Sequence, residues 1–407
     1  MSNSISGRDK IAESGTWSAR SVFAIACAGM LLFGIVLTTL GAILPDIIVR
    51  FNVSKTAAGG LFLLMSFCIL LGSLLFGPSV DRLGYRMPLA AASALVALGI
   101  ETIAFAPTLT LVRLGVAFIG LGGGVLNVAT NGVVADTADS GKAANLSLLG
   151  VFFGIGAVGV PFTLGALGNL ASQQSVLAIV GALAALSAIA TVLTGFPKPK
   201  QPQSFPLGKA LALVREAPLL LFGLMLFLQS GMEITVGGWT STFAREVLAL
   251  SGRAALFFLS LYWLGTMLAR LVLGSLLKTI APRRVLAASL ALAFFGVLLL
   301  ITAHATTVAA AGVFLVGAGF AAVFPVVLGW LGERYQALSG TAFSIALVMA
   351  LTGGMILPYT TGVIGERYGM RASLLVVPVA LVLSATLLTV VSLRRLIASH
   401  TQTETIS

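Results

Sequence analysis

One glutamate lies within an apolar segment in the second half of the chain, and it is the residue best suited to chemistry. Glu233 occurs in the run 224–240, which reads LMLFLQSGMEITVGGWT. If this segment crosses a membrane, a mid-depth acid costs about 2.5–3.5 kcal/mol and should face a cavity or a partner. Helical spacing places Gln229 and Thr240 on the same face. We interpret Glu233 as a group that binds solute and exchanges a proton; an acid paired with a neighbouring helix is the alternative.

A second group of polar and aromatic residues could contact a solute. Asn127 and Asn131 are four residues apart, so they share a helical face, and their carboxamides suit a neutral polyhydroxy ligand. Polar contacts between helices, worth about 0.6 kcal/mol each, are the alternative. Thr38 is a weaker hydroxyl candidate. Three aromatic residues could stack on a sugar ring or belong to an interfacial belt: Trp239, Tyr262 and Trp263.

Three further charged residues lie in apolar segments, and we interpret them as structural rather than as parts of a solute site. Glu101 and Arg113 flank a turn near Pro107 at equal sequence distance, so an antiparallel hairpin places them at similar depth. We predict that they form an ion pair, because isolated charges there would be costly. Arg270 is expected to extend its side chain to the lipid headgroups, with anion binding as the alternative.

The composition indicates an all-α polytopic membrane protein. The 407 residues are 58% hydrophobic and 9% charged, with a mean hydropathy of +1.06, whereas soluble chains are about 25% charged. Apolar segments of a length that crosses the hydrocarbon core recur along the chain. They predict twelve transmembrane helices: 21–44, 57–77, 88–106, 109–135, 143–168, 175–196, 217–243, 254–276, 284–303, 307–332, 340–364 and 372–393.

The distribution of basic residues predicts the topology. An even number of spans puts both termini on one side, and most lysines and arginines outside the spans fall on that side, so both termini are expected in the cytoplasm of a plasma (bacterial inner) membrane. A Pro-rich basic stretch at 197–216 divides the chain. We therefore predict two six-helix bundles at 21–196 and 217–393, with cytoplasmic tails at 1–20 and 394–407.

The two halves are related by an internal repeat. A shift of 197 residues superimposes landmarks from the first span to the fifth, and these are Gly34 on Gly231, Gly77 on Gly274, Arg86 on Arg283, Gly156 on Gly353 and Pro161 on Pro358. Parallel repeats of this kind are typical of transporters that bind their solute between the halves.

The stretch between the second and third predicted spans carries a specific order of residues. It reads GPSVDRLGYRMPL over 77–89, and it contains the candidates Gly77, Asp81, Arg82, Gly84 and Arg86. This order resembles the helix 2–3 loop signature of the major facilitator superfamily of transporters. The resemblance implies two facing six-helix bundles, with spans 1, 4, 7 and 10 lining the cavity. It also implies a gating role, in which Asp81 caps or pairs at the junction between bundles and the two arginines anchor it.

A finer resemblance concerns the segment around Glu233. The pattern G-x-E-x-x-x-G-x-W over 231–239 resembles the seventh helices of sugar permeases related to fucose and glucose/galactose proton symporters. It implies a monomeric secondary transporter for a sugar or related metabolite, with a proton or Na⁺ as coupling ion. Proton-antiport efflux of drugs or metabolites and a non-transporting sensor are the alternatives. The sequence has no nucleotide-binding loop, zinc spacing or nucleophile–base pair, so we expect no enzyme activity, cofactor, metal or nucleic-acid partner.

Overall fold

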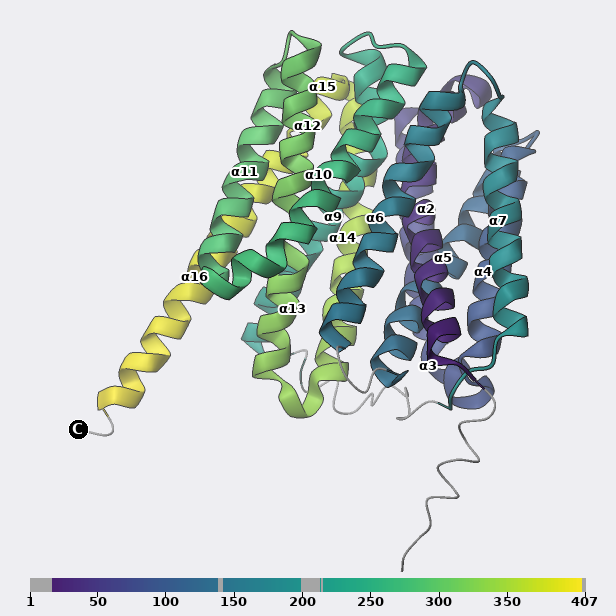
Figure 1. The fold of residues 1–407 in the computed structure, drawn as a ribbon. Coiled ribbons are helices and arrows are strands. Elements are labelled where there is room, and N and C mark those ends of the chain that lie inside the picture. The colour runs from purple at the N-terminus through teal and green to yellow at the C-terminus, as the bar shows by residue number, and fades with distance from the viewer. Residues whose placement is uncertain (1–16, 138–141, 199–212, 214, 405–407) are drawn as a thin grey trace, which may run out of the picture.

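The computed structural model describes residues 17–137, 142–198, 213 and 215–404, and within these ranges the chain is helical without strands (Figure 1). This confirms the predicted all-α class. The first 16 residues, most of the linker and the last three residues lie outside the described part, so the predicted domain limits stay a prediction.

Twelve of the described helical segments are long and apolar enough to cross a membrane, as predicted. The helices are α2 (Ala19–Phe51), α3 (Lys55–Leu83), α4 (Arg86–Ala104), α5 (Leu109–Thr137), α6 (Lys142–Leu167), α7 (Gln173–Leu193), α9 (Ala217–Glu246), α10 (Gly252–Thr279), α11 (Pro282–Thr302), α12 (Thr306–Phe320), α13 (Val323–Arg334), α14 (Ser339–Tyr368), α15 (Met370–Ser373) and α16 (Val376–Glu404). A 3₁₀ turn, Gln336–Leu338, precedes α14. Two spans are each divided, one between α12 and α13 and the other between α15 and α16.

Short turns with local hydrogen bonds join the helices at one end of the molecule. Ser54, Ser172 and Ser251 each precede a helix, and each hydroxyl accepts a hydrogen bond from the backbone N–H three residues later. This pairing satisfies one of the otherwise open N–H groups of the first helical turn. These turns lie at the upper end in Figure 1, opposite the start of α2 and the end of α16.

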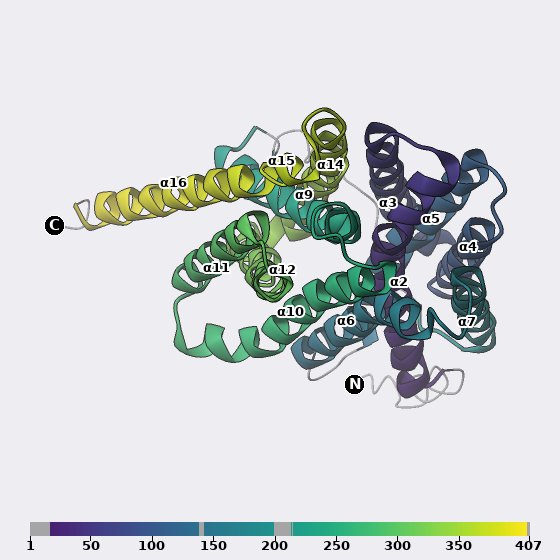
Figure 2. The same cartoon turned by 90° about the horizontal axis from the view of Figure 1, so that it is seen from above.

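Viewed from above, α2 to α7 form one group of helices and α9 to α16 form another (Figure 2). The helix pairs with the most extensive contacts between the groups are α2 with α9, α3 with α14, and α6 with α10. At the crossing of α2 and α9, a Cβ on Gly41 would lie 3.0 Å from the Cα of Gly238, so the backbones touch without side chains between them. We call these groups the N-terminal and C-terminal bundles.

The contacts between the bundles favour one end of the molecule. Toward the upper end, Ser66 of α3 donates a hydrogen bond to the carbonyl of Gly354 in α14, at 3.1 Å. Arg253 of α10 donates one to the carbonyl of Gly165 in α6, at 3.1 Å. We name this end, with the turns that follow Phe51, the closed end. We call the opposite end, with the turn between α3 and α4, the open end, because the contacts named above lie at the other end.

Candidate functional site

Glu233, the main candidate from the sequence, forms an ion pair between two helices with Arg270, a partner that the sequence did not predict. Glu233 of α9 is only 7% exposed, and its Oε1 lies 3.6 Å from Nη2 of Arg270 in α10. The prediction that Arg270 extends to the headgroups is therefore wrong. Glu233 lies 13 residues before the end of α9 and Arg270 lies 18 residues after the start of α10. The axial offset of about 7.5 Å, at 1.5 Å per residue, is within reach of an arginine side chain.

Aromatic rings surround this ion pair and connect it to the other bundle. The Arg270 guanidinium lies 5.3 Å from the ring centroid of Phe153 in α6, a cation–π geometry. Phe153 packs edge-on against Trp263 at 5.9 Å. The hydroxyl of Tyr262 donates to the backbone carbonyl of Glu233 at 3.3 Å. The site thus lies at the seam between the bundles, and Arg270 contacts both.

Gln229 extends the site by one helical turn, as its spacing from Glu233 predicted. Its side chain is fully buried, and its Nε2 donates a hydrogen bond to the carbonyl of Phe320 at the end of α12, at 3.0 Å. Its Oε1 has no hydrogen-bond partner among the described residues, and neither does Nε1 of the buried Trp263. A buried amide oxygen and an indole N–H without partners are unusual, because buried polar groups are nearly always hydrogen-bonded.

The two asparagines lie in the N-terminal bundle, apart from this group. Both are half-buried on α5, which packs on α2, α3 and α4. The Asn131 amide donates to the backbone carbonyl of Asn127 at 2.8 Å, so it is partly engaged by its own helix. The Asn127 carboxamide makes no hydrogen bond within the described part of the chain and remains the more available of the two.

Two other candidates serve helix packing in this structure. Trp239 is fully buried, its Nε1 donates to the carbonyl of Pro358 in α14 at 3.1 Å, and its ring packs against Phe62. The hydroxyl of Thr38 is also fully buried and donates to the carbonyl of Gly34 in its own helix at 3.2 Å. We therefore assign both residues to the scaffold rather than to the solute site.

Glu101 and Arg113 do not pair, contrary to the sequence prediction. No ion pair joins them in the described residues, and Arg113 is exposed. The reason is the position at which α4 crosses α5: a Cβ on Gly99 would lie 2.7 Å from the carbonyl oxygen of Gly115. Each charged residue is two positions from its glycine, about 200° around the helix, and so points away from the contact. Glu101 instead faces α7, where a Cβ on Gly181 would lie 2.9 Å from its Cδ.

The predicted gating loop is largely helical and belongs to the N-terminal bundle. The helix α3 continues through Gly77, Asp81 and Arg82 to Leu83, and only Gly84 and Tyr85 form the turn. Gly84 has φ of +68°, a conformation that favours glycine and ends the helix. Asp81 and Arg82 are exposed at the open end.

A tyrosine that sequence reasoning missed fixes this turn. Tyr85 is fully buried, and its hydroxyl donates to Oδ2 of Asp136 at the end of α5, at 2.8 Å. Burial, and then the hydrogen bond and charge of Asp136, raise the pKa of Tyr85. The next residue, Arg86, donates to the carbonyl of Val192 in α7. The turn is thereby tied to two helices of its own bundle.

Ion pairs also cross the seam at the closed end. Arg245 of α9 lies 2.6 Å from Asp46 of α2, and Glu246 lies 2.9 Å from Lys55 of α3. The backbone N–H of Lys55 also donates to Glu366 of α14. In the sequence these residues appear only as charges that flank the predicted spans. They could not be paired from the sequence, because pairing depends on which helix ends lie next to each other in the fold.

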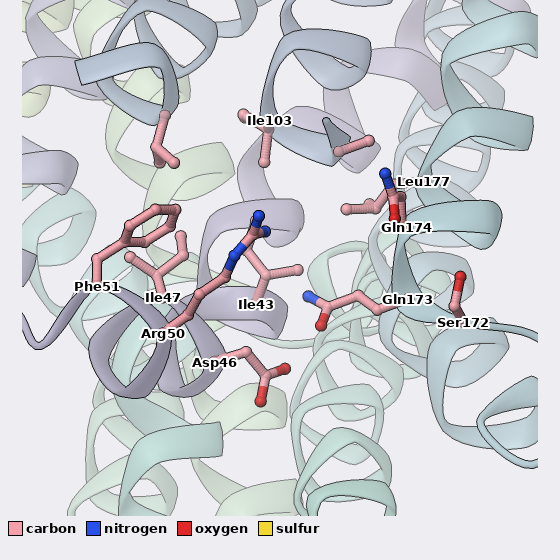
Figure 3. A pocket seen from close by; sticks show the side chains of 12 residues that line it. Ile43, Asp46, Ile47, Arg50, Phe51, Ile103, Ser172, Gln173, Gln174 and Leu177 are labelled. Atoms are coloured by element: carbon pink, nitrogen blue, oxygen red, sulfur yellow. The ribbon is translucent and has the colours of Figure 1, made fainter. Parts of the chain in front are cut away.

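A pocket of about 230 Å³ lies at the closed end, within the N-terminal bundle (Figure 3). Its polar lining comes from Asp46, Arg50, Ser172, Gln173 and Gln174. Arg50 donates to the carbonyl of Ala106 at 2.8 Å, and Asp46 holds Arg245, so both charges are already engaged. Glu233 and Arg270 do not line this pocket.

Comparisons with known proteins agree with this architecture. The family model described as Major Facilitator Superfamily matches residues 26–280 and 224–406. An uncharacterized transporter, y4wD, from Sinorhizobium fredii is 24% identical over 358 residues, covering 86% of this chain and 93% of that protein.

Solved structures show the same fold at low identity. The nucleoside transporter NupG superimposes with a TM-score of 0.77 at 17% identity, covering 91% of this chain and 98% of its own. A D-xylose-proton symporter gives a TM-score of 0.75 at 17% identity, with coverage of 90% and 96%. On the sequence match and this fold, the chain belongs to the major facilitator superfamily of membrane transporters.

Proposed function

We propose that this protein is a secondary active transporter that moves a small polar solute, a sugar or related metabolite, with a proton carried by Glu233. The observation that carries the proposal is the ion pair of the buried Glu233 with the half-buried Arg270 at the seam between the bundles. Acids at such depth are rare and mark proton or solute pathways. Alternating access then consists of opening the closed end and closing the open end around this site.

Protonation of Glu233 has a direct consequence for the seam. At 3.6 Å, two unit charges attract by about 4–5 kcal/mol at an effective dielectric constant of 20. When the carboxyl binds a proton, this attraction to Arg270 is lost. Arg270 also lies against Phe153 of the other bundle, so a change in its position alters the contact between bundles. Binding of one proton at Glu233 thus changes how tightly the two bundles are held together at the seam.

The solute class and the orientation rest on the sequence. The pattern around Glu233 resembles sugar permeases, and Asn127 of the N-terminal bundle has a carboxamide without a hydrogen-bond partner among the described residues. The names of two structural neighbours, a nucleoside transporter and a D-xylose-proton symporter, agree with a small polar solute. The excess of basic residues on the side of the open end supports a cytoplasmic location for that end, and hence an inward-open state.

Uptake into proteoliposomes with an imposed pH gradient tests the proposal. We expect the wild type to accumulate substrate down the proton gradient, and Glu233→Gln to lose accumulation while it retains counterflow exchange. Glu101→Gln is the matched control, because Glu101 is a second acid within a span but lies apart from Arg270. Accumulation by Glu233→Gln against the substrate gradient would refute the coupling role. Export driven by the same gradient would indicate antiport in place of symport.

A further inference from the structure

The guanidinium of Arg270 is only partly satisfied in this structure. A guanidinium has five N–H donors. The nearest approach to Glu233 is 3.6 Å, which is longer than a hydrogen bond, and Nε is buried without a partner in the described part of the chain. One face of the group is covered by the Phe153 ring. Arg270 therefore has unpaired N–H groups that could bind a second acceptor at the seam.

Few other ionisable groups face Arg270. Glu233 comes from α9, and Tyr262 lies on α10 itself, with its ring against Phe320 of α12. The sequence of α12 contains no charged residue, and α6 contains only Lys142 at its first position. On α11 the charged residues are confined to the first turn, at the open end, and α2, which also contacts α10, carries Arg20 at its start and Asp46 and Arg50 near its other end. Glu233 is thus the anion that balances Arg270 in the described structure.

We propose that the transported solute carries a single anionic group, such as a carboxylate, and that Arg270 binds this group once Glu233 has taken up a proton. This inference rests on the proposed proton coupling at Glu233. The proton moves from water to the Glu233 carboxylate, the solute anion takes the vacated place beside Arg270, and both leave on the other side of the membrane. No covalent bond forms or breaks, and the charge of the site is the same before and after the exchange.

The exchange explains why proton and solute move together. Neutral Glu233 without a solute anion leaves Arg270, whose side chain is 27% exposed and whose Nε is buried, without a counter-charge, which is unfavourable. A solute anion beside ionised Glu233 places two negative charges on one arginine. Only the empty ionised site and the protonated site with a bound anion are balanced, so neither ligand binds well alone.

The remaining open groups indicate the rest of the solute. Nε1 of Trp263 is a donor and Oε1 of Gln229 is an acceptor, and both are buried without partners among the described residues. The first matches a hydroxyl or carbonyl oxygen and the second matches a hydroxyl hydrogen. A hydroxylated carboxylic acid, such as a sugar acid, satisfies these groups better than a neutral sugar does.

Matched pairs of acids and neutral compounds provide the test. Binding of glucuronate against glucose, gluconate against sorbitol, and lactate against glycerol is measured on the purified full chain by calorimetry at pH 5.5 and pH 8. Both values lie above the pKa of these acids, which is about 3–4. We expect at least one acid to bind tenfold or more tightly at pH 5.5, with no such change for its neutral partner.

Variants separate recognition by Arg270 from coupling by Glu233. Arg270→Gln should abolish acid binding, Arg270→Lys should retain part of it, and Glu233→Gln should bind the acid equally at both pH values. The double variant Glu233→Gln with Arg270→Gln removes both charges and shows whether loss of binding reflects misfolding. Glu101→Gln should behave as the wild type.

Two results distinguish failure of this inference from failure of the proposed function. If a neutral sugar is accumulated with protons, and Glu233→Gln but not Arg270→Gln stops it, the coupling stands and the anionic solute is refuted. If Glu233→Gln accumulates solute as the wild type does, the coupling and this inference both fall. The absence of any acid that binds more tightly at pH 5.5 also overturns the inference.

Discussion

The crossing of α2 and α9 gives a direct means of disturbing the closed end. A Cβ on Gly41 would lie 3.0 Å from the Cα of Gly238 and 3.2 Å from the carbonyl carbon of Gly237. These neighbours are backbone atoms and cannot turn aside as a side chain does. We predict that Gly41→Ala forces the two helices apart and shifts the protein toward the conformation in which this end is open.

The size of the shift follows from the cost of overpacking. One additional methyl group in a well-packed contact costs about 1–3 kcal/mol. The contact joins the two bundles, so the cost falls on the closed conformation alone, and the ratio of the two conformations changes by about fivefold to 150-fold. The gain in helix propensity from glycine to alanine, about 1 kcal/mol, is common to both conformations and cancels.

Two glycines provide matched controls. A Cβ on Gly34 would lie 2.9 Å from the backbone nitrogen of Ala157 in α6, within the N-terminal bundle, so Gly34→Ala should lower the melting temperature without moving the equilibrium. A Cβ on Gly60 would meet no atom within 4 Å, so Gly60→Ala should have little effect on either quantity.

The measurement is the distance between spin labels on the two bundles at the closed end. Val49 and Tyr368 are 79% and 72% exposed, so labels there should not disturb the packing. The native Cys27 and Cys68 are both buried and would be replaced by alanine. Gly41→Ala should increase the population at the longer distance. If its distance distribution equals that of Gly60→Ala, the glycine contact does not govern closure and the reasoning is wrong.

Three further predictions concern other contacts. Asp46→Asn and Arg245→Gln should each move the same distance distribution by a factor of about 1.4–5, because a partly exposed ion pair contributes about 0.2–1 kcal/mol; a double-mutant cycle that gives no coupling, or an effect unchanged by high salt, would contradict this. Tyr85→Phe should lower the melting temperature, since the hydrogen bond from Tyr85 to Asp136 is lost, at a cost of about 1–3 kcal/mol. The pKa of Tyr85 is raised above its unfolded value, so its contribution is complete below pH of about 10 and should diminish as the pH rises further; a difference from wild type that is constant up to pH 11 would refute this. Trp239→Phe should lower thermal stability through loss of its hydrogen bond to α14 and leave the substrate KM unchanged, whereas a raised KM with normal stability would return Trp239 to the solute site.

The sequence predicted the level of a residue along the helices better than the direction in which its side chain points around its helix. Runs of apolar residues locate the spans, and the equal distances from the turn correctly placed Glu101 and Arg113 near one level. Their directions depend on where α4 and α5 cross, and the crossing is set by close contact at Gly99 and Gly115. Chain position alone does not identify which of several glycines makes the contact, so the predicted ion pair was wrong.

The same limit hid the partner of Glu233. The sequence identified the acid because a carboxyl in an apolar run is costly, and it identified Gln229 because a four-residue spacing fixes their relation within one helix. The relation of Glu233 to Arg270 depends on how α9 and α10 pack and on a side chain that spans an axial offset. A search for opposite charges across consecutive spans, with the reach of arginine allowed for, would have found this pair.

The position of the ion pairs on α9 suggests how proton binding reaches the closed end. Glu233 and Arg245 lie on one continuous helix, twelve residues and about 18 Å apart. Between them, Gly237 and Gly238 form the contact with α2. The segment of α9 from Glu233 to Arg245 is held at both of its ends and is in close backbone contact at its centre, so it transmits a displacement along its length. Release of Arg270 by protonated Glu233 therefore loosens one anchor of the helix whose last turn carries the pairs to Asp46 and Lys55, and the closed end should open more readily when the carboxyl is neutral.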